Sequence, residues 1–185
     1  MTAEGVTAAQ VAAKADASAT VNLTGDQTIA GIKTFSSRPV MPAATVSMVR
    51  LNTANGYGST NTMIRRFTNS VTNTGSDITY ADSATLGASF TIATAGVYAI
   101  SFNDEFSAGG YMGITLNTTA PTTAVQSTPA SEQLCTTYAN GANGADNAAW
   151  TGYLAAGSVV RAHTAGGAAG AGVPGACQFT ITRVA

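Results

Sequence analysis

Apolar and polar residues alternate in a series of short runs along the C-terminal three quarters of the chain. The clearest run is 96–106 (GVYAISFNDEF), where Tyr98, Ile100 and Phe102 fall on one face of an extended strand. Similar runs separated by turn signals occupy 45–51, 63–67, 78–80, 87–94, 111–117, 133–138, 148–154, 158–164 and 177–184. We therefore expect an all-β domain over 45–185, in which 148–154 and 158–164 form a hairpin-like pair. Roughly eight to ten strands in a domain of this length are typical of a sandwich or jelly roll.

The inward-facing residues of these runs predict the core of the sandwich. In a half-buried strand every second side chain points inward and is apolar. The predicted core residues are Phe90, Ile92, Tyr98, Ile100, Phe102, Cys177, Phe179 and Ile181. Cys177 and Cys135 match no zinc or redox spacing, so we interpret Cys177 as a small core residue. A disulfide between the two cysteines is the alternative.

The first 44 residues lack this alternation. Residues 1–20 are rich in alanine and carry Val6 and Val11 as large apolar side chains, so a short helix there would be marginal unless another surface packs on it. We interpret 1–20 as an anchoring tail, with Val6 and Val11 as the anchor. Residues 37–44 (SRPVMPAA) contain two prolines and are interpreted as a stiff linker.

Residues 21–36 carry five large apolar side chains that one chain cannot bury alone. The entropy lost by ordering this segment exceeds the gain from burying those side chains, so it needs neighbours. Ile29, Ile32 and Phe35 recur at every third residue, which places one side chain per turn on a common axis if three chains wind together. An extended strand lying on the C-terminal domain is the alternative. The residues predicted to pack on the trimer axis are Val21, Leu23, Ile29, Ile32 and Phe35.

The charge pattern limits the partners of the chain. Charged residues are 9% of the sequence, with eight Lys and Arg, nine Asp and Glu, and a net charge of −1. Nucleic acid is excluded as a partner because phosphate binding needs clustered basic residues. No run approaches the roughly 18 apolar residues of a membrane span, and 1–20 has no apolar run of a signal peptide, so we expect no membrane insertion. A surface so poor in charge favours assembly.

Residues 23–35 (LTGDQTIAGIKTF) resemble the LTGxQTIxGxKTF motif of bacteriophage fibre proteins, which include head fibres and tail fibres. The resemblance covers thirteen consecutive residues. It implies a trimeric virion protein on the outer surface of a phage particle, made in the host cytoplasm.

The C-terminal domain resembles the C1q/TNF-like jelly roll. The segments that carry this resemblance are 90–92 (FTI), 95–102 (AGVYAISF), 154–160 (LAAGSVV) and 179–181 (FTI), with Ser158 where the family usually has Asp. The resemblance implies a ten-strand sandwich that works as a homotrimer. Because some C1q-like trimers bind calcium, Asp104 and Glu105 are weak candidate ligands; otherwise we interpret them as solvated turn residues.

The sequence offers little for catalysis. A hydrolase needs a nucleophile, a base and an orienting group, and His163 is the single histidine. We interpret His163 as a strand-surface or interface residue, and we predict neither enzymatic activity nor a cofactor. In the doublet Arg65-Arg66 the side chains point to opposite faces of a strand, so one of them can pair with a carboxylate on a neighbouring chain; simple solvation is the alternative.

Two functions follow as hypotheses. The first is a homotrimeric head fibre or capsid decoration protein, attached through residues 1–20 to the major capsid protein or another virion protein; only twenty residues precede the fibre motif, which favours this role. The alternative is a short tail fibre or receptor-binding tip that recognises a host surface glycan or protein through loops 118–130 and 165–176. Aromatic side chains that can stack on sugar rings are candidates for that recognition: Tyr57, Tyr111, Tyr138 and, unless it belongs to the core, Trp150.

Overall fold

A computed structural model describes residues 48–52, 58–106, 108–140, 144–165 and 176–184. The chain divides into two units, Met1–Met41 and Pro42–Ala185, and every described residue belongs to the second unit. The anchor and trimer-axis residues predicted from the sequence lie outside the described residues, as do Tyr57 and most of the loop 165–176. The predictions made for those positions therefore stay predictions.

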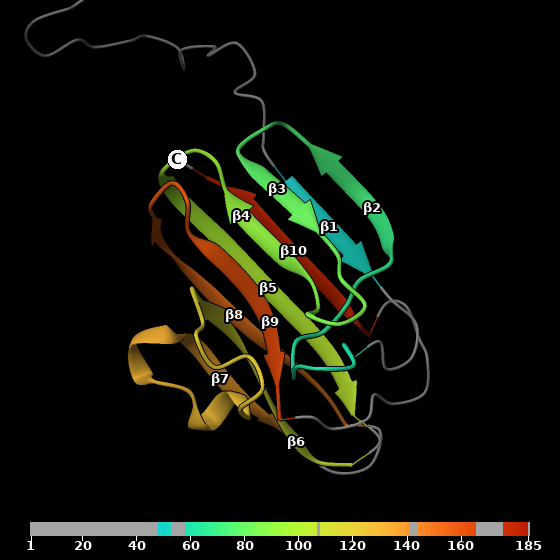
Figure 1. Ribbon diagram of the computed structural model, residues 1–185. Helices are drawn as coiled ribbons and strands as arrows, with labels where there is room; N and C mark the ends of the chain where they lie inside the picture. Colours follow the sequence, from blue (N-terminus) through green and yellow to red (C-terminus); the bar gives the residue numbers. More distant parts are fainter. Residues whose placement is uncertain (1–47, 53–57, 107, 141–143, 166–175, 185) are drawn as a thin grey trace, which may run out of the picture. The chain divides into compact units, whose positions relative to one another are not determined.

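The described residues of the second unit form ten β-strands (Figure 1). They are β1 (Met48–Asn52), β2 (Asn69–Thr74), β3 (Ile78–Ala81), β4 (Ser89–Ile92), β5 (Gly96–Phe106), β6 (Gly110–Leu116), β7 (Gln133–Ala139), β8 (Gly144–Leu154), β9 (Val159–Thr164) and β10 (Gln178–Arg183). The helical structure within the described ranges is two short 3₁₀ turns, η1 (Val125–Ser127) and η2 (Ala130–Glu132).

The strands form two antiparallel sheets of five strands each. The first sheet has the order β2-β1-β10-β5-β8 and the second sheet the order β3-β4-β9-β6-β7. Strands that follow each other in the chain often belong to opposite sheets, as β5 and β6 do, and as β8 and β9 do. This topology confirms the all-β jelly-roll sandwich expected from the sequence.

The expected hairpin of 148–154 and 158–164 is wrong. The chain does turn at 155–157, where Gly157 has a φ of +84° that favours glycine. The turn carries the chain from β8 in the first sheet to β9 in the second, so the two strands do not pair. Alternation marks each strand, but it does not say which strand is its neighbour.

The region before β3 also differs from the expectation. β2 has the sequence NSVTNT and nearly every side chain in it is exposed, so no apolar alternation marks it as a strand. The expected strand at 63–67 is an irregular segment that lies beside β9. The Arg65 N–H donates to the Ala162 carbonyl (2.9 Å), and the Thr164 N–H donates to the Met63 carbonyl (3.0 Å).

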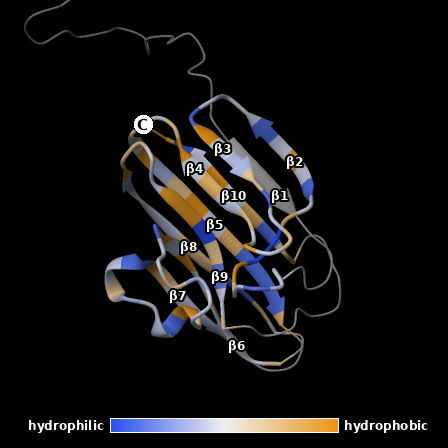
Figure 2. Ribbon diagram, viewed as in Figure 1, coloured by the Kyte–Doolittle hydropathy of each residue, from blue (hydrophilic) through white to orange (hydrophobic). Residues whose placement is uncertain are grey.

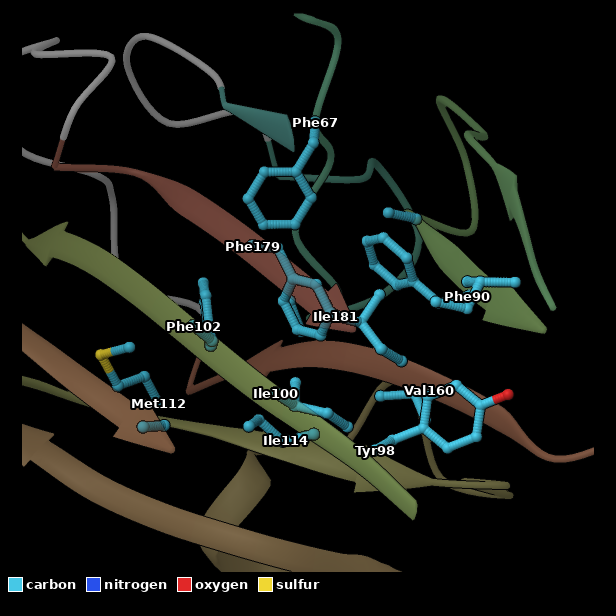
Figure 3. Close-up of a cluster of buried hydrophobic side chains, with 14 of the residues drawn as sticks. Phe67, Phe90, Tyr98, Ile100, Phe102, Met112, Ile114, Val160, Phe179 and Ile181 are labelled. Carbon is cyan, nitrogen blue, oxygen red and sulfur yellow. The ribbon is translucent and has the colours of Figure 1, made fainter. Parts of the chain in front are cut away.

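The core fills the space between the two sheets (Figure 3). The structure buries all eight side chains predicted for it: Phe90, Ile92, Tyr98, Ile100, Phe102, Cys177, Phe179 and Ile181. Phe90 of the second sheet stacks on Phe179 of the first, with ring centroids 4.2 Å apart. Phe67 packs against both rings, so the irregular segment before β2 closes one side of the core.

Candidate interaction surfaces and the buried polar cluster

The C-terminal end of β5 carries a buried polar cluster inside the sandwich. Figure 2 shows β5 changing from hydrophobic to hydrophilic toward this end. Arg65 Nε lies 2.5 Å from Asp104 Oδ2, and both side chains are buried. The thiol of Cys177 donates to the other oxygen of Asp104 (3.2 Å). The guanidinium also lies over the ring of Phe106, 5.2 Å from its centroid, which is cation–π distance.

This cluster changes the interpretation of Asp104 and Glu105. Both residues lie within β5 and are buried, so they are not solvated turn residues. As neighbours in a strand, their side chains point to opposite faces of the sheet, and Asp104 is already paired with Arg65. Among the described residues, no three His, Cys, Asp or Glu side chains are grouped so as to hold a metal ion.

The two cysteines are free thiols, so the disulfide alternative is not realised. Burial raises the pKa of Cys177 to about 11, and the charge of Asp104 adds to this effect. Burial also raises the pKa of Cys135. Neither environment activates a thiolate as a nucleophile.

Each arginine of the basic doublet pairs with a carboxylate of the same chain. Arg65 pairs with Asp104, and Arg66 Nη2 lies 2.7 Å from Asp82 Oδ2 at the surface. The side chains do diverge as expected, but neither needs a carboxylate from a neighbouring chain to be neutralised.

His163 lies on the outer face of the second sheet and is nevertheless fully buried. The segment 117–132 covers it: the Nε2–H donates to the carbonyl of Thr123 (2.8 Å), and Nδ1 lies 3.4 Å from Thr115 Oγ1. Because a carbonyl only accepts, Nε2 carries the hydrogen. Burial lowers the pKa of His163, and the nearby Arg161 lowers it further. His163 is therefore a neutral structural residue rather than an exposed strand-surface residue.

The same segment is fastened to the sheet at further points. Val125 is fully buried, and a Cβ atom at Gly113 would lie 3.0 Å from Val125 Cγ2, so the missing side chain of Gly113 makes room for it. The Met63 N–H donates to the Pro121 carbonyl (2.7 Å). Loop 118–130, a candidate for recognition in the alternative hypothesis, thus covers the sheet.

The outer face of β10, β5 and β8 in the first sheet is uncharged except at Glu105, which has the same outward direction in β5 and is buried. In each strand the buried residues alternate with outward-facing ones, in β5 as far as Asp104. We call this set the neutral face: Gln178, Thr180 and Thr182 of β10; Val97, Ala99, Ser101 and Asn103 of β5; and Ala145, Asn147, Ala149, Thr151 and Tyr153 of β8. Tyr153 is its most prominent member, with 68% of its surface exposed.

Two of the tyrosines predicted for recognition lie together on the second sheet. Tyr111 of β6 is the register partner of Tyr138 of β7. Their ring centroids are 4.8 Å apart with an edge-to-face arrangement, and both side chains are exposed. Trp150, in contrast, is half-buried and packs against the core, with its ring over Gly152.

No protein-family model matches the sequence, and no curated protein matches it. No helix among the described residues has the length and apolar character needed to cross a membrane. The structure is similar to that of Eiger TNF from S. frugiperda, with a TM-score of 0.53 and 10% identity over 76% of this chain and 94% of that one. It is also similar to murine APRIL at pH 8.5, with a TM-score of 0.52 and 13% identity over 75% of this chain and 99% of that one. These likenesses show that Pro42–Ala185 contains a TNF-like jelly roll.

Proposed function

We propose that the chain is a self-associating structural protein of a bacteriophage particle, a homotrimeric head fibre or capsid decoration protein whose jelly roll projects from the particle. The observation that carries self-association is the neutral face of the first sheet. In this role the chain is a building block with no enzymatic activity. The resemblance of residues 23–35 to the phage fibre motif supports the assignment to a virion.

The neutral face suits a protein interface because the removal of water from it on association costs little free energy. Its polar groups already hydrogen-bond to each other: Asn147 Nδ2 donates to Ser101 Oγ (2.8 Å) and to Asn103 Oδ1 (2.7 Å). Paired polar groups lose less than unpaired ones when water is removed. The alanines and threonines let a neighbouring backbone approach closely, and Tyr153 supplies an aromatic anchor of the kind that dominates interface energies.

The size of the complex tests self-association. We expect light scattering on the full chain to give three times the 18.4 kDa mass of one copy. Ala149→Glu places one charge per subunit on the neutral face and should shift the complex toward monomers, because an unpaired charge is costly to bury. Thr79→Glu is the matched control, since Thr79 is exposed on the edge strand of the second sheet. A monomeric full chain, or equal mass for both variants and the parent, would contradict the proposed interface.

Binding to particles tests the virion role. Phage particles produced without this chain are mixed with the purified full chain or with a variant that lacks residues 1–20, and then sedimented. We expect the full chain to sediment with the particles, through the major capsid protein or another virion protein. The shortened variant should stay a trimer in the supernatant. If neither form sediments with the particles, the proposed attachment is wrong.

One observation favours the alternative, a short tail fibre or receptor-binding tip. The exposed pair Tyr111–Tyr138 is an aromatic surface on the sheet opposite the neutral face. Such a pair can contact a glycan or a protein on a host surface while the neutral face is occupied by other copies of the chain.

A further inference from the structure

We propose that Tyr111 and Tyr138 form a binding site for a neutral saccharide. Their strands lie side by side in the second sheet (Figure 1), and the two residues are directly opposite each other in the register. The residues on either side of Tyr111, Gly110 and Met112, are buried, so the Tyr111 side chain points away from the core. Tyr111 is 38% exposed and Tyr138 48% exposed, so water reaches both rings.

The backbone at Gly109 fixes the position of the Tyr138 ring. A Cβ atom at Gly109 would lie 2.6 Å from Tyr138 Oη and 3.2 Å from Cζ, so the end of the ring occupies the space that a side chain would fill. The edge-to-face contact with Tyr111, at 66° between the ring planes, also restrains the Tyr138 ring. A ring placed in this way before the ligand arrives loses little conformational entropy on binding.

The composition of the two strands selects the ligand. Neither β6 (GYMGITL) nor β7 (QLCTTYA) contains a charged residue, so the strands offer no counter-charge to a carboxylate, a sulfate or an amine. A tyrosine presents a broad apolar ring and a hydroxyl that donates and accepts hydrogen bonds. A pyranose has the complementary shape, with C–H groups on its face and hydroxyls at its rim.

The tyrosine pair is accessible to such a ligand. Both side chains are exposed on the outer face of β6 and β7, so both rings can be approached from the surface. The site lies on the second sheet, whereas the neutral face belongs to the first. The inference is therefore independent of the attachment of the chain to a particle, and binding can be measured on purified protein.

Saturation-transfer NMR and calorimetry on the full chain test the site. The neutral probes are maltotriose, lactose and triacetylchitotriose, and the acidic probe is 3′-sialyllactose. We expect at least one neutral probe to bind and the acidic probe to bind no better than lactose. Tyr111→Ala and Tyr138→Ala should each weaken the binding about tenfold or more, as loss of an aromatic anchor does. Leu86→Ala, which removes an exposed apolar side chain from the connection between β3 and β4, should bind like the parent.

Gly109→Ala gives the sharper variant because it keeps both rings. The added methyl overlaps the end of the Tyr138 side chain, which can rotate away, and lies 3.3 Å from the Ala139 carbonyl oxygen, which needs to shift by only a few tenths of an ångström. We expect weaker saccharide binding with an unchanged thermal midpoint. Absence of transfer to all three neutral probes at millimolar concentration overturns the proposal. Binding that survives in the Tyr111→Ala, Tyr138→Ala double variant, or a clear preference for 3′-sialyllactose, also overturns it.

Discussion

Arg65 Nε lies 2.5 Å from Asp104 Oδ2, and the two side chains are 6% and 2% exposed. The pair joins the irregular segment before β2 to the inner face of β5, which are 39 residues apart in the sequence. Among the described residues, the buried Arg65 Nη2 has no hydrogen-bond partner, and Asp104 is the carboxylate that neutralises this guanidinium there. In a site that excludes water, removal of either member of such a pair leaves the other as a buried, unpaired charge, which destabilises the fold.

Asp104→Ala is expected to destabilise the jelly roll by about 3–5 kcal/mol, because it leaves the Arg65 charge buried and unpaired. The double variant Arg65→Met, Asp104→Leu removes both charges and should recover much of that loss. Urea unfolding followed by circular dichroism measures the difference. Arg66→Met is the control, since its pair with Asp82 lies at the surface and should contribute about 0–1 kcal/mol. If the double variant is no more stable than Asp104→Ala, the buried charge is not the cause of the loss.

The sequence is sufficient to predict the core but not the polar cluster. Alternation identifies Tyr98, Ile100 and Phe102 because each inward position of β5 is apolar up to that point. Asp104 continues the same inward alternation, but a charged residue near the end of a strand is also typical of a turn. Its partner Arg65 is brought to it by the tertiary fold, which a local pattern does not encode. A carboxylate at an inward position of a clear strand is the signal that indicates a buried pair.

The surface features likewise depend on tertiary structure that a local sequence pattern does not encode. The exposed aromatic candidates include Tyr111 and Tyr138, but only the register of β6 and β7 shows that they are neighbours. The sequence predicts His163 at a strand surface, and the alternation of β9 does place it outside the core. The covering segment 117–132 contains no strand pattern, so its position over His163 does not follow from the sequence.

The stability of the jelly roll should fall as the pH drops below about 6.5. Burial lowers the pKa of His163 in the folded state, so the unfolded chain takes up this proton at higher pH than the folded chain does. The stabilising contribution of neutral His163 is therefore complete above the unfolded pKa and is lost progressively below it. Arg161 opposes protonation and Glu132 favours it. Thermal unfolding between pH 8 and pH 5 measures this slope.

His163→Gln should flatten that slope. Glutamine keeps an N–H donor for the Thr123 carbonyl but does not titrate in this range. The variant is expected to be less stable than the parent at pH 8 and to lose less stability on acidification. An identical slope in the variant would assign the pH dependence to other groups.

Cys177 should resist thiol reagents in the folded protein. With a pKa of about 11, its thiolate fraction at pH 8 is on the order of 0.1%, compared with roughly a quarter for an ordinary cysteine. In a Cys135→Ser variant, which leaves Cys177 as the one thiol, we expect almost no reaction with DTNB at pH 8. Addition of urea should release one equivalent per chain. A fast full equivalent without urea would contradict the burial of this thiol beside Asp104.

Gly113→Ala should destabilise the fold more than the addition of one methyl group usually does. A Cβ atom at this position would overlap the carbonyl oxygen of Cys135 on β7 and would lie 3.0 Å from Val125 Cγ2. Because the first of these is backbone within the β6–β7 ladder, it cannot rotate away, and the strands or the segment 117–132 must move. We expect a loss of about 3 kcal/mol or more, at the upper end for overpacked sites.

Gly157→Ala separates this steric effect from ordinary backbone strain. Gly157 has a φ of +84°, and no atom of the described residues lies within 4 Å of the position that a Cβ would take there. The substitution therefore meets only the cost of a left-handed alanine, about 1–2 kcal/mol. Urea unfolding should rank Gly113→Ala as the less stable variant, and limited proteolysis should cut 117–132 faster in it alone. Equal stabilities, with 117–132 equally protected from cleavage in both variants, would show that β6 does not need a residue without a side chain beneath Val125.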